Sequence, residues 1–219
     1  MGNLFNMDNA LFTFLGKICD VIFLSVVYAL VCIPLITIGP ANTAIYYATV
    51  KVIRRERGYL FREFFKSFKL NFKRASITGV ILMLMYIIIA VDIYASWRTV
   101  GSATSINSIL FGIYIAIAIL LTSFTIYVFP VLSRFELKGK QLVKVVFFMS
   151  MKHLPFTILM LIIQVAAIVG VILIPILIFV LPVLSTFLIS LLMERIFKKY
   201  MPHSEGSPEE TGKDLWYLE

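Results

Sequence analysis

Long apolar runs are the feature that most constrains how this chain can fold. Residues 18–38, 77–95, 108–130 and 156–193 are almost continuously apolar, at or near bilayer-spanning length. A hydrocarbon core about 30 Å thick needs roughly 20 helical residues to cross it, and such runs are not stable in water. The runs therefore predict an all-α, polytopic helical membrane protein.

The composition indicates a single membrane domain. Hydrophobic residues make up 60% of the 219 residues and charged residues only 15%, a balance outside that of soluble domains. Because the apolar runs use most of the chain, we expect residues 1–200 to form one membrane domain. Residues 201–219 are polar, and we expect them to form a mobile C-terminal tail. No length is left for a separate soluble catalytic module.

Positive charges predict the topology. Lysine and arginine crowd residues 51–74 and 134–152, whereas the end of the second apolar run and the loop that follows it carry only Asp92 and Arg98. Short loops rich in lysine and arginine stay on the cytoplasmic side. We therefore expect both basic loops to be cytoplasmic, and the basic residues at 195–199 place the C-terminus on the same side.

The last apolar run is too long for one span. A straight helix of that length would measure about 57 Å. Proline removes a helix hydrogen bond and clashes with the preceding turn, so a tight hairpin near Ile174 and Pro175 would divide the run into helices 156–174 and 176–193. A single tilted, kinked helix is the less favoured alternative.

The N-terminal part allows two topologies. After residues 18–38 the chain turns at Gly39 and Pro40, and residues 41–55 form a short apolar segment. If this segment is a short returning helix, the protein has six membrane helices and an internal N-terminus. If it lies at the cytoplasmic face, there are five spans and an external N-terminus. The hairpin-like Gly-Pro pair slightly favours the first arrangement.

A basic aromatic segment precedes the second span. Residues 59–74, YLFREFFKSFKLNFKR, place rings and cations at helical spacing, which predicts an interfacial helix with rings in the acyl boundary and cations on anionic headgroups. The rings belong to Phe61, Phe64, Phe65, Phe68 and Phe72. The helix either only sets topology or also binds a partner. The candidate docking or lipid-contact residues are Arg62, Lys66, Lys69, Asn71, Phe72, Lys73 and Lys152.

A candidate turn motif follows the first span, and it consists of Pro34, Thr37, Gly39, Pro40 and Asn42. Proline and glycine would shape the turn, and the asparagine side chain would cap the following helix.

The form Pro-x-x-Ser/Thr occurs at residues 34–37, 130–133 and 182–185. This recurrence either reflects a duplicated hairpin, as in transporters whose halves rock around a midplane site, or arises by chance.

Polar residues inside apolar runs are the usual pointers to a membrane site. Gln164 is the deepest strong polar group, and it either joins helices or contacts a substrate. Asp92 is the second candidate, although it lies near a helix end where water can reach it.

Enzyme signatures are not found in the sequence. There is no phosphate-binding glycine loop, no HExxH and no GxSxG motif. His153 and His203 are the two histidines, and neither has a companion for metal binding. We therefore predict no catalytic, cofactor-binding or metal-binding residues, no cofactor and no nucleic-acid partner.

A family resemblance adds to this interpretation. The stretch from CIPLITIGPANTAIYY through FREFFKSFKLNFKRASITG, together with the KHLP sequence at residues 152–155, resembles the YesL family of bacterial membrane proteins. The resemblance implies a multi-pass protein of the Gram-positive plasma membrane. The family is usually placed near genes for carbohydrate breakdown and ABC-type sugar uptake, and it supplies no catalytic residues to carry over.

Three functional hypotheses follow. The first is a non-enzymatic protein, accessory or regulatory to an ABC-type carbohydrate uptake system, with anionic lipids and ABC transporter subunits as partners. The second is a small autonomous transporter or channel, with Gln164 lining the path. A membrane enzyme acting on lipid-linked substrates comes third, because no acid, base or metal set is evident. The oligomeric state cannot be predicted from the sequence.

Overall fold

The computed structural model describes residues 10–99, 105–135, 137 and 139–200, and every secondary-structure element in them is helical. The elements, in chain order, are α1 (Ala10–Val31), the 3₁₀ turn η1 (Leu35–Thr37), α2 (Ile38–Ala48), the π-helical turn η2 (Thr49–Arg54), α3 (Leu60–Thr99), α4 (Ser105–Arg134), α5 (Gly139–Lys152), α6 (Leu154–Leu173), the 3₁₀ turn η3 (Pro175–Phe179) and α7 (Leu181–Phe197). The predicted mobile tail at 201–219 lies outside the described residues.

Three helices of the described chain are long and apolar enough to cross a membrane. They are Leu60–Arg98, Asn107–Arg134 and Leu154–Leu173, within α3, α4 and α6. The all-helical fold and these three helices support a membrane protein. The finer prediction of five to six spans is not confirmed, because α2 and α7 have only 11 and 17 residues and α1 is not among the three.

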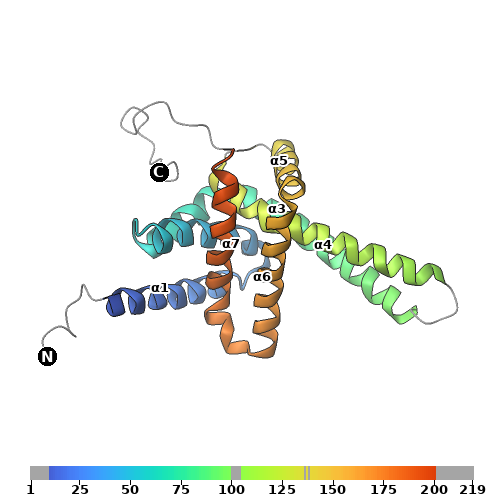
Figure 1. The fold of residues 1–219 in the computed structure, drawn as a ribbon, viewed down its shortest axis with the longest axis horizontal. Coiled ribbons are helices and arrows are strands. Elements are labelled where there is room, and N and C mark those ends of the chain that lie inside the picture. Colours follow the sequence, from blue (N-terminus) through green and yellow to red (C-terminus); the bar gives the residue numbers. More distant parts are fainter. Residues whose placement is uncertain (1–9, 100–104, 136, 138, 201–219) are drawn as a thin grey trace, which may run out of the picture.

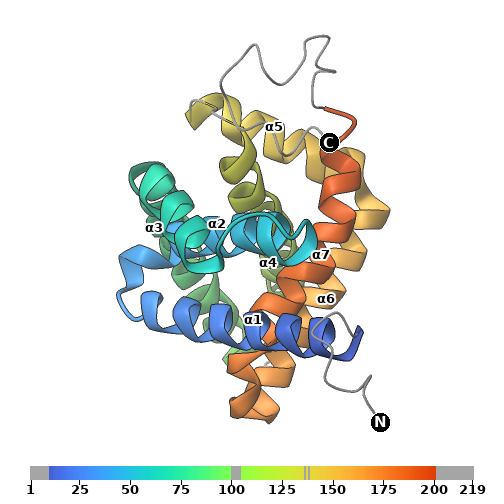
Figure 2. The same cartoon turned by 90° about the vertical axis from the view of Figure 1, so that its left-hand side faces the viewer.

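The two helical hairpins run in different directions. Figure 1 shows α3 and α4 side by side, projecting together from the rest of the molecule, whereas α6 and α7 form a second hairpin that runs across them. Helix α5 lies at the end where α6 begins, and α1 lies on the side opposite the projecting hairpin. Figure 2 shows α2 in the middle, between α3, α4, α7 and α1.

Helix α3 corrects one expectation. The sequence suggested a separate interfacial helix at 59–74 followed by a span at 77–95, but the structure has one helix of 40 residues. The linking residues Ala75 and Ser76 contain no helix breaker, and both are buried, so the helix continues. Its length is about 60 Å at 1.5 Å per residue, about twice the thickness of a hydrocarbon core.

Helix α2 packs so closely against α3 that backbone atoms of the two helices are in contact. A Cβ atom added to Gly39 would overlap the carbonyl group of Ala75, and one added to Gly79 would lie 3.0 Å from the Gly39 Cα atom. On the same helix Ala41 and Ala44 are fully buried. Small residues allow helices in a membrane to approach closely, so α2 is the core of the molecule.

The turn before α2 lies at Pro34 to Thr37 and not at Gly39 and Pro40, where the sequence placed it. Helix α1 already ends at Val31 instead of residue 38, and Gly39 and Pro40 lie inside the first turn of α2. Pro34 precedes η1, and the Thr37 hydroxyl donates to the carbonyl oxygens of Val31 and Pro34. The expectation that Asn42 caps α2 is wrong, because Thr37 occupies the N-cap position and Asn42 lies inside the helix. Asn42 instead accepts a 2.9 Å hydrogen bond from the Tyr28 hydroxyl of α1.

The recurring Pro-x-x-Ser/Thr form has a local explanation. In each case the hydroxyl donates to the proline carbonyl three residues earlier, from Thr37, from Ser133 at 2.7 Å and from Ser185 at 3.1 Å. Serine and threonine commonly bond back in this way within a helical turn. The recurrence therefore does not require a duplicated hairpin.

The expected break in the last apolar run is confirmed. Helix α6 ends at Leu173, the 3₁₀ turn η3 begins at Pro175, and α7 returns beside α6. The second helix starts at Leu181 and ends at Phe197, later than the predicted 176–193, because η3 occupies the residues after the proline.

Candidate functional site

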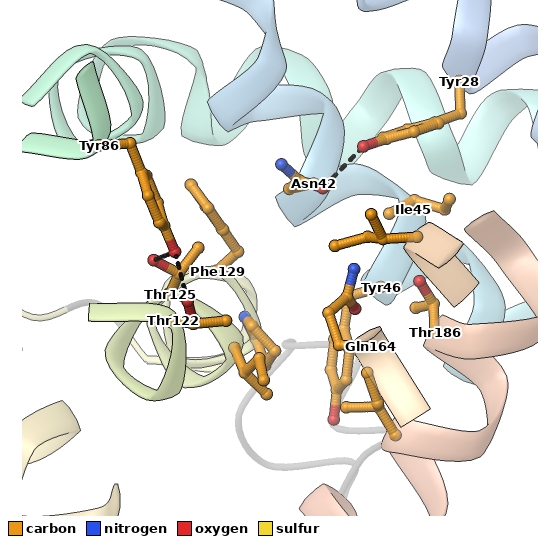
Figure 3. A pocket seen from close by; sticks show the side chains of 14 residues that line it. Tyr28, Asn42, Ile45, Tyr46, Tyr86, Thr122, Thr125, Phe129, Gln164 and Thr186 are labelled. Carbon is orange, nitrogen blue, oxygen red and sulfur yellow. Dashed lines mark hydrogen bonds between the residues drawn. The ribbon is translucent and has the colours of Figure 1, made fainter. Parts of the chain in front are cut away.

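A cavity with several polar side chains lies between α2 and the two helical hairpins (Figure 3). It has a volume of about 300 Å³, and a neighbouring cavity of about 270 Å³ shares six of its lining residues. The shared residues are Tyr28, Asn42, Ile45, Gln164, Ile168 and Thr186. The two form one site, with contributions from α1, α2, α3, α4, α6 and α7.

Two predicted polar residues meet in this site. Figure 3 shows Asn42 on α2 and Gln164 on α6 on the same side of the cavity. The Asn42 oxygen is occupied by Tyr28, whereas the Gln164 amide forms no hydrogen bond with another residue in the described part of the chain. Asp92, the other predicted intramembrane polar residue, lies farther along α3 and does not line the cavity.

The opposite wall carries a hydroxyl cluster. The Tyr86 hydroxyl of α3 lies 3.3 Å from the Thr122 oxygen and 3.1 Å from the Thr125 oxygen of α4. Both threonines also donate to backbone carbonyls of their own helix at 2.8 Å. Thr122 and Thr125 are polar residues inside the apolar run 108–130, and such residues are candidates for a membrane site. Tyrosines inside such runs were the signal that could have found this wall.

A buried ion cluster lies at the C-terminal ends of α4 and α7, next to the basic segments. The Arg134 guanidinium of α4 lies 2.7 Å from a Glu194 carboxylate oxygen of α7, and the Tyr46 hydroxyl donates to the same oxygen at 2.8 Å. Arg55 approaches the other oxygen at 3.9 Å. The side chains of Arg134 and Glu194 are only 1% and 6% exposed. Removal of either partner would leave the other as an uncompensated buried charge.

Tyr46 links the cavity to this cluster, since its ring lines the cavity while its hydroxyl bonds Glu194. The neighbouring Arg54 donates to the Ser190 carbonyl oxygen at 2.9 Å. From the sequence, Arg54 and Arg134 were interpreted only as loop charges. Glu194, an acid at the end of an apolar helix with basic residues after it, was not singled out.

A second buried ion pair joins η2 to the start of α3. Lys51 and Glu63 are 3.1 Å apart, with side chains 5% and 9% exposed. Lys51 also lies over the ring of Tyr47. Together with the contact of Arg55 to Glu194, this pair attaches the first half of the basic loop to the helices around it.

The residues of the predicted docking segment on α3 differ in exposure. Arg62, Lys66, Lys69 and Lys73 are exposed along the first half of the helix, and Phe72 is 39% exposed. The expectation that the rings of this segment all enter the acyl boundary is wrong. Phe64 is fully buried, and Phe65 and Phe68 pack with it against residues of α1, α2 and α7.

Two other predicted docking residues behave differently from the four cations. The Asn71 amide donates to the Ser67 carbonyl oxygen at 3.1 Å, a bond within its own helix. Lys152 is exposed at the end of α5, where its ammonium group lies over the rings of Phe148 and Tyr200. Lys152 therefore belongs to a separate corner of the molecule.

His153 and Glu56 are among the titratable groups outside the candidate spans whose pKa values are shifted. Burial lowers the pKa of His153, and the positive charges of Lys199 and Lys152 lower it further. The ring of His153 lies within hydrogen-bond distance of the Tyr200 hydroxyl, at 3.1 Å. A hydrogen bond from Lys17 lowers the pKa of the exposed Glu56 carboxyl.

A family model matches the N-terminal part of the chain. The family model described as "Protein of unknown function, DUF624" matches residues 9–93, which include α1, α2 and most of α3. Searches of curated proteins and of solved structures found no match. The matched region contains Asn42, Tyr86 and the basic start of α3 but not Gln164 or Glu194.

Proposed function

We propose that this protein is a YesL-type, non-enzymatic, multi-pass protein of the bacterial plasma membrane that acts as an accessory or regulatory component of an ABC-type carbohydrate uptake system. The resemblance to the YesL family supports the proposal, and its turn and phenylalanine motifs lie inside the matched residues 9–93. The partners are anionic lipids and subunits of the transporter.

The proposed topology has five to six membrane helices with both basic loops and the C-terminus in the cytoplasm. Contacts of both basic loops with the same helix support their location on one side of the membrane. Arg54 from the first loop contacts Ser190, and Arg134 at the start of the second contacts Glu194, both on the last turns of α7. Basic segments on one side of the helices agree with retention of positive loops in the cytoplasm.

The exposed face of α3 carries the proposal. Its cations Arg62, Lys66, Lys69 and Lys73 recur at helical spacing, and Leu70 beside them is 75% exposed. Glu63, on the same turn as Lys66, faces inward to Lys51, so it does not neutralise the outer face. A basic face with an apolar residue is suited to anionic headgroups and to an acidic partner surface.

Co-purification tests this role. The tagged protein would be extracted from its native membrane in mild detergent, and associated proteins identified by mass spectrometry. We expect permease or ATPase subunits with the wild type and their loss in Lys69→Glu/Lys73→Glu. The matched control is Lys198→Glu/Lys199→Glu, which makes the same charge change at two exposed lysines after α7. Recovery of the protein alone, together with normal sugar uptake after its deletion, would reject the accessory role.

The cavity favours a second candidate function, a small autonomous transporter or channel. It contains the Gln164 amide and lies among helices of both hairpins. Liposomes containing only this protein would show saturable solute flux, and Gln164→Leu would reduce it. A broad solute panel without flux would reject this alternative.

A further inference from the structure

The cavity offers hydrogen-bonding groups that the described protein residues leave unused. Gln164 has an acceptor oxygen and two N–H donors, and Asn42 uses its oxygen for Tyr28 while its NH₂ group has no hydrogen bond to another described residue. Polar groups within a membrane domain are costly unless they are paired. Two amides facing one cavity from α2 and α6 therefore require water or a ligand as their partner.

The lining selects for a neutral partner. None of the described residues that line the two parts of the site carries a formal charge. A charged ligand would lose its hydration without gaining an opposite charge, which is unfavourable in a low-dielectric site. The nearest acid on the Tyr46 side, Glu194, is already held by Arg134.

Apolar surfaces alternate with these polar groups. The rings of Tyr28, Tyr86 and Phe129 and the side chains of Ile45 and Ile168 line the same space. A molecule that carries hydroxyl groups on some faces and C–H groups on others fits such a lining. The two parts of the site, of about 300 and 270 Å³, are each at or just below the lower end of small-molecule sites, which favours a single sugar unit over an oligosaccharide.

We propose that this cavity binds a small neutral polyhydroxy compound, of monosaccharide or polyol size, through the amides of Gln164 and Asn42. The inference does not rest on the docking role, because binding is measured on the purified protein without transporter subunits. It also holds for a protein that senses such a solute without transporting it.

The test is calorimetric titration of the full chain in nanodiscs with glucose and with sorbitol. We expect saturable binding of at least one of them, weakened about tenfold in Gln164→Leu through loss of the amide bonds. The control Gln141→Leu makes the same change at an exposed position on α5 and should bind as the wild type does. Gluconate and glucosamine, which are charged, should not compete.

Three results would overturn the proposal: no binding of either neutral probe, unchanged binding in Gln164→Leu, or equal binding of gluconate. If Gln164→Leu does not give folded protein, Thr186→Val replaces it, because Thr186 lines both parts of the site. Failure of binding would leave the co-purification result unaffected, so the two proposals are separable.

Discussion

Helices α2 and α6 show opposite relations between hydrophobicity and burial. Helix α6 is one of the three candidate spans, yet its side chains are mostly exposed, with Ile162 at 59% and Ile172 at 72%. Helix α2 contains glycine, proline, threonine and asparagine, and it lies in the core. In a membrane the lipid is as apolar as leucine, so close packing and hydrogen bonds hold helices together. High hydropathy therefore marks the lipid-facing surface, and small and polar residues mark the core.

The largest expected effect concerns the ion cluster that holds α2. Glu194→Ala removes the carboxylate beside the buried Arg134 and takes the acceptor from Tyr46. Breaking a buried ion pair costs about 3–5 kcal/mol, so we expect a loss of this size in the free energy of unfolding in bicelles. Glu56→Ala removes a carboxylate from the exposed pair with Lys17 and should have no measurable effect. Equal effects of the two substitutions would show that Glu194 does not hold the core.

The next effect concerns the contact between α2 and α3. Gly39→Ala puts a methyl group onto the Ala75 carbonyl group, and overpacking of this kind costs about 1–3 kcal/mol. Gly112→Ala is the control, because nothing lies within 4 Å of a Cβ atom there, and it should be neutral or slightly stabilising. The measurement is the free energy of unfolding of both variants. An unchanged value for Gly39→Ala would contradict the close contact between α2 and α3.

The contrast also explains which parts of the fold could be predicted. Spans in α3, α4 and α6 and the break at Pro175 follow from local signals, which are hydropathy and the chemistry of proline. The burial of α2 could not be predicted, because its alanines and glycines are equally common in loops and in tight helix contacts. The continuity of α3 was missed because a change from basic to apolar composition alters the surroundings of a helix but does not end it.

The candidate site could likewise be predicted only in part, because local signals identify residues but not the contacts between distant segments. Gln164 and Asn42 were named from the sequence, but their meeting in one cavity depends on how α6 packs near α2, a contact between distant segments. Glu194 was overlooked because positive charges near membranes were interpreted as topology signals. A lone acid among cations is better interpreted as the partner of a buried arginine.

A smaller effect is expected at the bond between α1 and α2. Tyr28→Phe removes the hydroxyl that donates to Asn42, and the loss of one hydrogen bond costs about 0.5–1.5 kcal/mol. Tyr59→Phe, at a side chain that is 78% exposed, is the matched control. Unfolding of both variants in bicelles would measure the difference, and indistinguishable values would show that the Tyr28 bond does not stabilise α2.

The smallest effect tests the lipid-facing side of the comparison. Ile162→Ala truncates an exposed side chain of α6, and because lipid replaces the lost contacts, the free energy of unfolding should change by no more than about 0.5 kcal/mol. Met160→Ala, on the same helix at a fully buried position, should cost about 2–5 kcal/mol. A large cost at Ile162 would mean that this face packs against another protein chain, and the relation between hydropathy and lipid contact would fail for α6.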